Sequence, residues 1–218
     1  MTPHSAVRRG SNGTINLTMI VRVACLHTAE SNVAVFEASR EDLGPCGKDE
    51  AVLHHEVRAD LLADAERAGG LTSEIAKRTG DALLALCEGV DAVVLTCSTL
   101  GPAVGGVVEK AEPVPVLRVD DALAREAVRQ GGRVVALCAV ETTLAPTRAL
   151  FEEAARATGA EVEVRLVRGA WAAFQAGERG RYLALVAEAA DEAARNSVPR
   201  VALAQASMAG AAKLTRVG

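Results

Sequence analysis

Aromatic residues are scarce in this sequence, at 2% of 218 residues, and no basic stripe is present. The net charge is slightly negative, at −4. We therefore expect no nucleic-acid partner, because the stacking surfaces and cationic patches that such partners need are both missing. No apolar run reaches the ~18 residues of a membrane-spanning helix, which disfavours a membrane protein.

Further absences narrow the class of protein. No G-x-G-x-x-G motif follows the first expected strand and no Walker motif is present, which disfavours nucleotide-binding enzymes. The N-terminal residues lack the apolar core of a signal peptide. The five cysteines are scattered and odd in number, which favours reduced thiols and a cytoplasmic location. A zinc site of Cys46, His54 and His55 is disfavoured, because its spacing matches no usual ligand pattern.

Apolar, β-branched segments alternate with helix-like segments from residue 20 onward, which predicts βα units and parallel sheets. The expected strands are residues 20–26, 51–57, 91–96, 114–119, 133–138, 160–167 and 200–204. Thr72, Asp120 and Thr143 are expected to cap helices. A further helix is expected from Pro102 to about Glu112.

The two halves of the chain resemble each other. RVACL at 22–26 is similar to RVVAL 111 residues later, and VDAVVLTCSTLGPA at 90–103 is similar to VPRVALAQASMAGA 108 residues later. The sequence therefore predicts two similar parallel-sheet α/β half-domains, related by a pseudo-twofold axis, with a cleft between them. The expected parts are a flexible N-terminal lead-in (1–19), a first half (20–118), a crossing helix (119–132) and a second half (133–218).

Cys97 is the residue of this repeat that can carry chemistry. It ends an apolar strand and precedes Ser98, Thr99 and an expected helix, whose first N–H groups can hold an anion and lower the thiol pKa. Such a thiol could exchange a proton with a carbon next to a carboxylate. Cys97 could equally be a small buried hydrophobic residue. The matching residue of the second half is Gln205, whose amide does not titrate.

The segments LTCSTLGP (95–102), CAVETTLAPT (138–147) and LAQASMAG (203–210) resemble signature loops of the aspartate/glutamate/hydantoin racemase superfamily, which also includes arylmalonate decarboxylase and maleate isomerase. The resemblance implies two α/β halves with the active site between them, no cofactor, no metal and a homodimer. It implies that Cys97 is the catalytic cysteine of the first half and that Gln205 occupies the place of the second. The residues it places around the substrate are Ser98, Thr99, Thr142, Thr143, Ser207 and Met208.

Gln205 removes the two-thiol racemisation that the resemblance would otherwise imply. In one hypothesis Cys97 works alone, in proton transfer at a carbon α to a carboxylate, in decarboxylation of a malonate-type acid, or as a nucleophile. In a second, His27 at the end of the first strand supplies the missing base, unless it is a structural histidine. In a third, the chain binds a small carboxylate without turning it over.

Two further expectations concern the cleft and the end of the chain. Trp171 and Phe174 are expected to pack as a core pair, or alternatively to line the mouth of the cleft. Members of the superfamily usually continue beyond the last expected helix, so the second half is expected to be truncated at its C-terminus.

Overall fold

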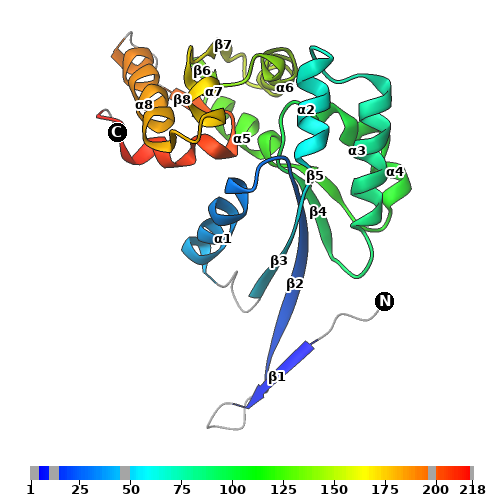
Figure 1. The fold of residues 1–218 in the computed structure, drawn as a ribbon. Helices are drawn as coiled ribbons and strands as arrows, with labels where there is room; N and C mark the ends of the chain where they lie inside the picture. Colours follow the sequence, from blue (N-terminus) through cyan, green and yellow to red (C-terminus); the bar gives the residue numbers. More distant parts are fainter. Residues whose placement is uncertain (1–4, 10–14, 45–49, 196–199, 217–218) are drawn as a thin grey trace.

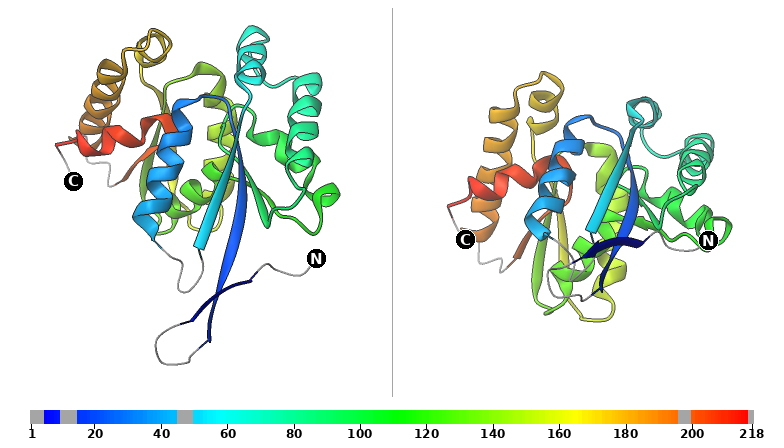
Figure 2. Two further views of the ribbon diagram at one scale, coloured as in Figure 1. Left: turned by 60° about the horizontal axis from the view of Figure 1, so that its bottom comes forward. Right: turned by 90° about the horizontal axis from the view of Figure 1, so that it is seen from below.

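The computed structural model of the protein describes residues 5–9, 15–44, 50–195 and 200–216 (Figure 1). Its strands form two separate sheets, each with helices on its faces (Figures 1 and 2). The strands are β1 (Ser5–Arg9), β2 (Ile15–His27), β3 (Glu50–Val57), β4 (Ala92–Leu95), β5 (Val116–Arg118), β6 (Arg133–Cys138), β7 (Glu161–Leu166) and β8 (Arg200–Leu203).

The two sheets repeat one topology, which confirms the predicted α/β architecture of two similar halves. In the first sheet β2 lies between β3 and β4, all parallel, and β5 follows β4. In the second sheet β6 lies between β7 and β8, again all parallel. The first strand of each half is therefore central, and the next two strands of that half flank it. Such parallel strands need crossover helices, which the intervening segments provide.

The segments between strands form helices at nearly every expected place. The α-helices are α1 (Ser31–Leu43), α2 (Ala59–Arg67), α3 (Ser73–Ala85), α4 (Val108–Ala111), α5 (Val119–Val128), α6 (Leu144–Ala155), α7 (Ala170–Gln175) and α8 (Arg179–Arg195). Three 3₁₀ segments are η1 (Gly101–Gly106), η2 (Glu141–Thr143) and η3 (Ala206–Lys213). Within the described part of the chain, no helix combines the length and the apolar character that crossing a membrane requires.

The helix caps agree only in part with the expectations. The Thr72 hydroxyl accepts the Ile75 N–H at 3.3 Å, as expected of an N-cap. Asp120 instead lies inside the first turn of α5 and pairs with Arg118, and the Thr143 hydroxyl donates to a carbonyl rather than capping α6. The helix expected after Pro102 is the 3₁₀ segment η1 followed by the single turn of α4, since two glycines at 105 and 106 weaken an α-helix there.

The N-terminal lead-in and the crossing helix differ in extent from the expectation. β2 begins at Ile15 and pairs in antiparallel register with β1, from Ser5 opposite Met19 to Arg9 opposite Ile15. Figure 1 shows this hairpin projecting away from the rest of the molecule. The helix that connects the halves, α5, ends at Val128, because the glycines at 131 and 132 adopt left-handed φ values of 66° and 74°.

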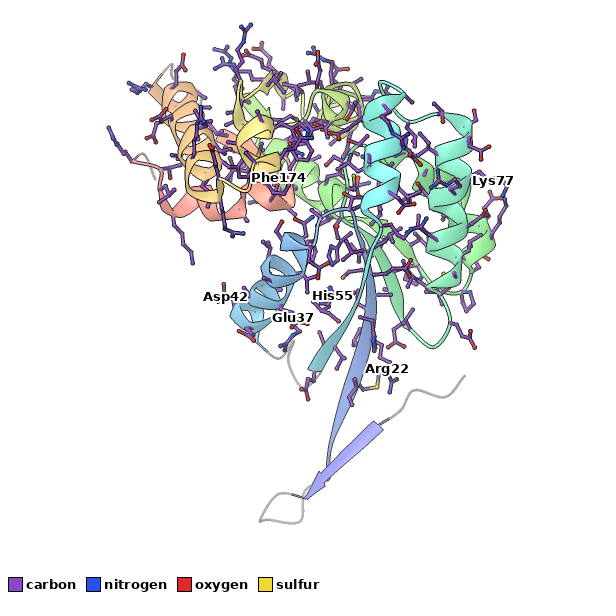
Figure 3. The ribbon with its side chains drawn as sticks, in the orientation of Figure 1. Arg22, Glu37, Asp42, His55, Lys77 and Phe174 are labelled. Atoms are coloured by element: carbon purple, nitrogen blue, oxygen red, sulfur yellow. The ribbon has the colours of Figure 1, made fainter. Side chains whose placement is uncertain are left out.

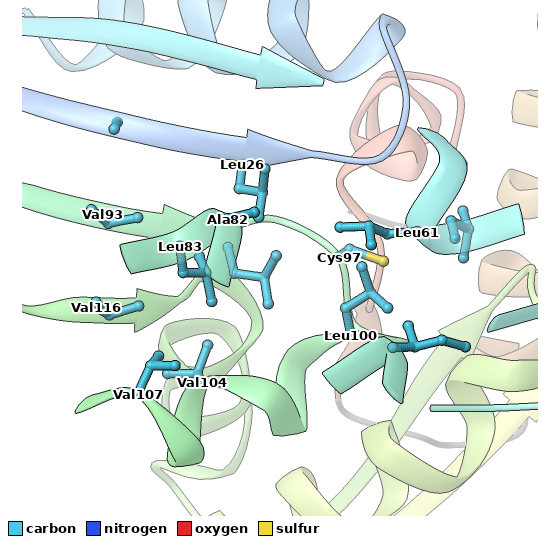
Figure 4. Packing of buried hydrophobic residues seen from close by; sticks show 14 of the residues in the cluster. Leu26, Leu61, Ala82, Leu83, Val93, Cys97, Leu100, Val104, Val107 and Val116 are labelled. Atoms are coloured by element: carbon cyan, nitrogen blue, oxygen red, sulfur yellow. The ribbon is translucent and has the colours of Figure 1, made fainter. Parts of the chain in front are cut away.

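The hydrophobic core consists of three clusters of mostly Ala, Val and Leu side chains. One lies between the first sheet and α2, α3 and η1 (Figure 4), and the other two cover the two faces of the second sheet. α6 contributes the fully buried Phe151 on one of those faces, and α8 contributes Tyr182 and Val186 on the other. Packing of the helices against both sheets holds the carboxyl ends of the strands in place. The candidate site lies at these strand ends.

Candidate active site

The backbone register places Cys97 and Gln205 at equivalent positions of the two halves. Leu26 of β2 pairs with Leu95 of β4, and Leu137 of β6 pairs with Leu203 of β8. One hydrogen bond then extends each ladder by a residue: the Thr96 N–H donates to Leu26, and the Ala204 N–H donates to Leu137, both at 3.0 Å. Cys97 and Gln205 are the next residues along the two loops.

A pocket lies between the two loops and is lined from both halves. The first half contributes Thr28, Ala29, Asn32, Leu62, Thr96, Cys97, Ser98 and Thr99. The second half contributes Val140, Thr143, Trp171, Phe174, Gln205, Ala206 and Ser207. The cavity volume is about 30 Å³, enough for about two water molecules but too small for an amino acid. A substrate therefore requires the walls to move apart.

Trp171 and Phe174 of α7 pack as a pair against the core, as first expected, and also form an apolar wall of this pocket, as the alternative had it. Their rings stack at 5.0 Å between centroids. Trp171 also packs against the core of the first half. Since Trp171 of the second half packs against the first-half core, this contact must shift if the cleft opens there.

Cys97 faces this pocket from a mostly apolar surrounding. Its side chain is 8% exposed and packs with Leu61 and Leu100 (Figure 4). Burial raises the pKa of the Cys97 thiol, although hydrogen bonds from the Thr28 hydroxyl and from the backbone N–H groups of Leu100 and Thr99 act in the opposite direction. The expectation of a lowered pKa is therefore wrong, because desolvation outweighs the local donors. The thiol is protonated at neutral pH and suits proton donation.

Gln205 is held by the loop that follows β6. Its Oε1 accepts the backbone N–H of Ala139 at 2.5 Å and that of Val140 at 3.3 Å. A cysteine side chain is too short to take over both bonds. The amide nitrogen of Gln205, a donor, has no partner among the described residues. Gln205 thus ties its own loop to the loop after β6 and presents the two N–H bonds of its amide to the pocket.

Two hydroxyl groups of the expected site are used in holding its loops. The Ser98 hydroxyl donates to the carbonyl of Ala204 at 3.1 Å and thereby joins the two halves. The Thr143 hydroxyl donates to the carbonyl of Val140 at 2.6 Å. Both side chains line the pocket, but their hydroxyl hydrogens are occupied, so each offers an acceptor rather than a donor to a ligand.

The other expected substrate contacts lie at different depths. Thr99 lines the pocket and shares a 3.3 Å hydrogen bond with Thr142, which stands behind the lining. Ser207 lines the pocket and bonds at 2.7 Å to the phenol of Tyr182, which fixes its position. Met208 is fully buried in the core of the second half and does not line the pocket.

His27 does not line the pocket either. It is fully buried, and both ring nitrogens are engaged: Nδ1 with the Thr96 hydroxyl and Nε2 with His55 Nδ1, each at 2.8 Å. Burial, together with the neighbouring His55, lowers the pKa of His27 to about 4. An imidazole with this pKa is a weak base, so the geometry offers no support for a second acid/base at this position.

Asn32 lines the pocket and was not expected from the sequence. It is buried near the start of α1, and its Oδ1 has no hydrogen-bond partner. A buried, unpaired amide oxygen is costly unless a donor from a ligand or water bonds to it. Asn32 is therefore a further candidate for binding substrate. Its position follows from the turn after β2, which the sequence did not reveal.

A larger hollow lies elsewhere, between α8 and the segment around Leu214 and Arg216, with a volume of about 440 Å³. Its lining contains Ala, Glu, Asp, Arg and Leu side chains but no thiol, imidazole or hydroxyl group. The small pocket at Cys97 is therefore the better candidate for chemistry, despite its size.

The comparisons with known proteins agree with the α/β fold of two halves. The family model described as Asp/Glu/Hydantoin racemase matches residues 27–217. The chain belongs to this family. A search of curated proteins finds no significant match.

A solved structure shows the same fold. An aspartate racemase from Picrophilus torridus has a TM-score of 0.61 and 12% identity, over 87% of this chain and 81% of that one. At this identity the likeness shows the fold alone. A maleate isomerase from Pseudomonas putida S16, solved with maleate, has a TM-score of 0.41 and 15% identity, over 67% of this chain and 63% of that one. That score is too low to support an argument.

Proposed function

We propose that the protein transfers a proton, without a cofactor, to or from a carbon α to the carboxylate of a small molecule. The observation that carries the proposal is the composition of the pocket at the two equivalent loops. Among the described residues that line it, Cys97 is the only conventional acid/base, and its counterpart Gln205 does not titrate. In this proposal Cys97 is the single acid/base and acts on one face of the substrate carbon.

The substrate carboxylate is held by neutral donors in this proposal, because no Lys or Arg lines the pocket. The amide nitrogen of Gln205 is a donor without a partner among the described residues, and Ser207 gives a second when Tyr182 donates to it. These groups would also stabilise the enediolate that forms when the α-carbon loses a proton or a carboxylate. The walls of Leu62, Trp171 and Phe174 would exclude water from that intermediate.

Decarboxylation of a malonate-type acid is the second candidate, and the protonation state of Cys97 favours it. Loss of CO₂ leaves an enediolate that needs a proton donor and no base. A buried thiol whose pKa is raised is such a donor. Its S–H bond breaks as the C–H bond forms, and the thiolate then regains a proton from water.

The experiment is a turnover screen in D₂O, followed by NMR, with amino acids, hydantoins and substituted malonates. Cys97→Ala is the test variant, and Cys138→Ala is the matched control, because it removes a buried thiol outside the pocket lining. We expect deuterium at the α-carbon, or loss of CO₂ from a malonate, in the wild type and the control but not in Cys97→Ala. The absence of both reactions across the screen, with measurable binding of a carboxylate, would replace the proposal with that of a non-catalytic binding protein.

A further inference from the structure

A cluster of three metal-binding side chains lies in the first half, outside the pocket lining. Cys25 and His27 are two residues apart on β2 and therefore face the same side of the sheet. His55 stands directly opposite Cys25 on β3. The sulfur of Cys25 and one ring nitrogen from each histidine all lie within 4.8 Å of one another. Helix α1 covers this side, and Figure 3 shows His55 and Glu37 between α1 and β3.

The hydrogen bonds around the cluster allow a lone pair on each of two facing nitrogens. In one tautomer the Thr96 hydroxyl donates to the carbonyl of Leu26, its oxygen accepts from His27 Nδ1–H, and His27 Nε2 carries a lone pair. The Glu37 carboxylate accepts from His55 Nε2–H at 3.1 Å, which leaves a lone pair on Nδ1 of a neutral His55. In that tautomer the two lone pairs face each other at 2.8 Å, and a metal ion can bind both. In the other tautomer the Thr96 hydroxyl donates to His27 Nδ1, and His27 Nε2–H donates to His55 Nδ1 without a cation.

The second half shows that the fold does not require polar groups at these positions. By the strand registers, Cys25, His27 and His55 correspond to Ala136, Cys138 and Val164. Those three residues pack in an apolar cluster under α6. Where the second half has an apolar surface under α6, the first half has a thiol and two imidazoles under α1, each of a type that binds transition metals.

We propose that Cys25 Sγ, His27 Nε2 and His55 Nδ1 bind one divalent ion of the zinc class. Thiolate and imidazole are the ligands that Zn²⁺ and Co²⁺ prefer, at bond lengths of about 2.0 to 2.3 Å. Ligand atoms around one tetrahedral ion then lie about 3.3 to 3.6 Å apart, so the histidines need to separate by about half an ångström. Thr96 and Glu37 orient the two imidazoles from behind, as the outer partners of metal-bound histidines do.

This site differs from the zinc site weighed from the sequence and departs from the expectation of no metal. Cys46 lies outside the described residues, and His54 points to the exposed side of β3. The proposed ion would join β2 to β3 just before Thr28, where β2 continues into the pocket wall. It would therefore stabilise the pocket wall, independently of the chemistry proposed for Cys97.

The test is a titration of the full-length chain, first stripped with a chelator, using Zn²⁺ and Co²⁺. Cys25→Ala and His55→Val copy the second half, which shows that these residues suit such positions. Cys138→Ala and His54→Ala are the matched controls, each removing the same residue type from outside the cluster. Circular dichroism confirms that each variant is folded.

We expect one equivalent of Co²⁺ to produce a thiolate-to-metal charge-transfer band in the wild type and both controls. Cys25→Ala should lose the band, and its affinity for Zn²⁺ should fall on the order of 100-fold. Glu37→Gln should keep the band but weaken binding about 10-fold. Zn²⁺ should raise the Tm of the wild type but not of Cys25→Ala or His55→Val. A chain without the band, or a band that survives in Cys25→Ala, would overturn the proposal and leave only a hydrogen bond between the histidines.

Discussion

Gln205→Met tests the structural role of the amide that replaces a second thiol. Methionine has a similar length but lacks the strong acceptor, so the substitution leaves the N–H groups of Ala139 and Val140 without their partner and opens little space. Both residues are buried, and a buried donor without a partner costs about 1–3 kcal/mol. The bond from Val140 is long, at 3.3 Å, so most of the loss comes from Ala139.

We therefore expect Gln205→Met to lower the free energy of unfolding by about 2–3 kcal/mol. For a chain of this size that loss corresponds to a fall in Tm of about 4–12 °C. Urea unfolding followed by circular dichroism gives the free energy, provided that the slope against urea stays constant. Gln175→Met is the matched control on an exposed site, where we expect a change within about 0.5 kcal/mol. Equal stability of Gln205→Met and the wild type would refute the assigned role of the amide.

Three further predictions concern the pocket loops. Gln205→Cys places a second thiol opposite Cys97. We expect this variant to racemise a substrate whose α-proton the wild type exchanges without inversion, and chiral chromatography would measure this. A product of unchanged stereochemistry would count against a two-thiol arrangement of these loops. The pKa of the Cys97 thiol is raised, so we expect its alkylation by iodoacetamide to be slow at pH 7 and to accelerate as the pH rises above 9. Mass spectrometry would locate the modified cysteine. Fast alkylation at pH 7 would show that Cys97 is a thiolate and contradict the raised pKa. Gly101→Ala would push a methyl group into the guanidinium of Arg118, which pairs with the buried Asp120. We therefore expect the free energy of unfolding, measured in urea, to fall by about 1–3 kcal/mol. An unchanged free energy would mean that Arg118 moves aside freely.

The repeat in the sequence predicted the most useful feature of the fold. The two offsets, 111 and 108 residues, are those of the equivalent strand pairs β2/β6 and β4/β8, so the alignment of Cys97 with Gln205 follows from sequence alone. The strands were predictable because each is a short β-branched run between breakers. The start of β2 at Ile15 was missed, because its pairing partner β1 is short and polar.

What the sequence could not predict depends on contacts between distant segments. The role of Gln205 requires the loop of Ala139 to lie beside it, and the pKa of Cys97 depends on how many apolar side chains surround it. The cluster of Cys25, His27 and His55 requires the register of β2 against β3. A register shift by one residue would turn His55 to the other face and bring His54 to the cluster instead.

The stereochemistry of exchange tests the central claim most directly. A single enantiomer of a substrate found in the screen would be incubated in D₂O, and deuterium incorporation and inversion would be measured in the same sample. We predict deuterium incorporation without inversion, absent in Cys97→Ala, because one thiol on one face removes and returns the proton. Incorporation and inversion at equal rates in the wild type would contradict the account, because a second acid/base would then act from the side of Gln205.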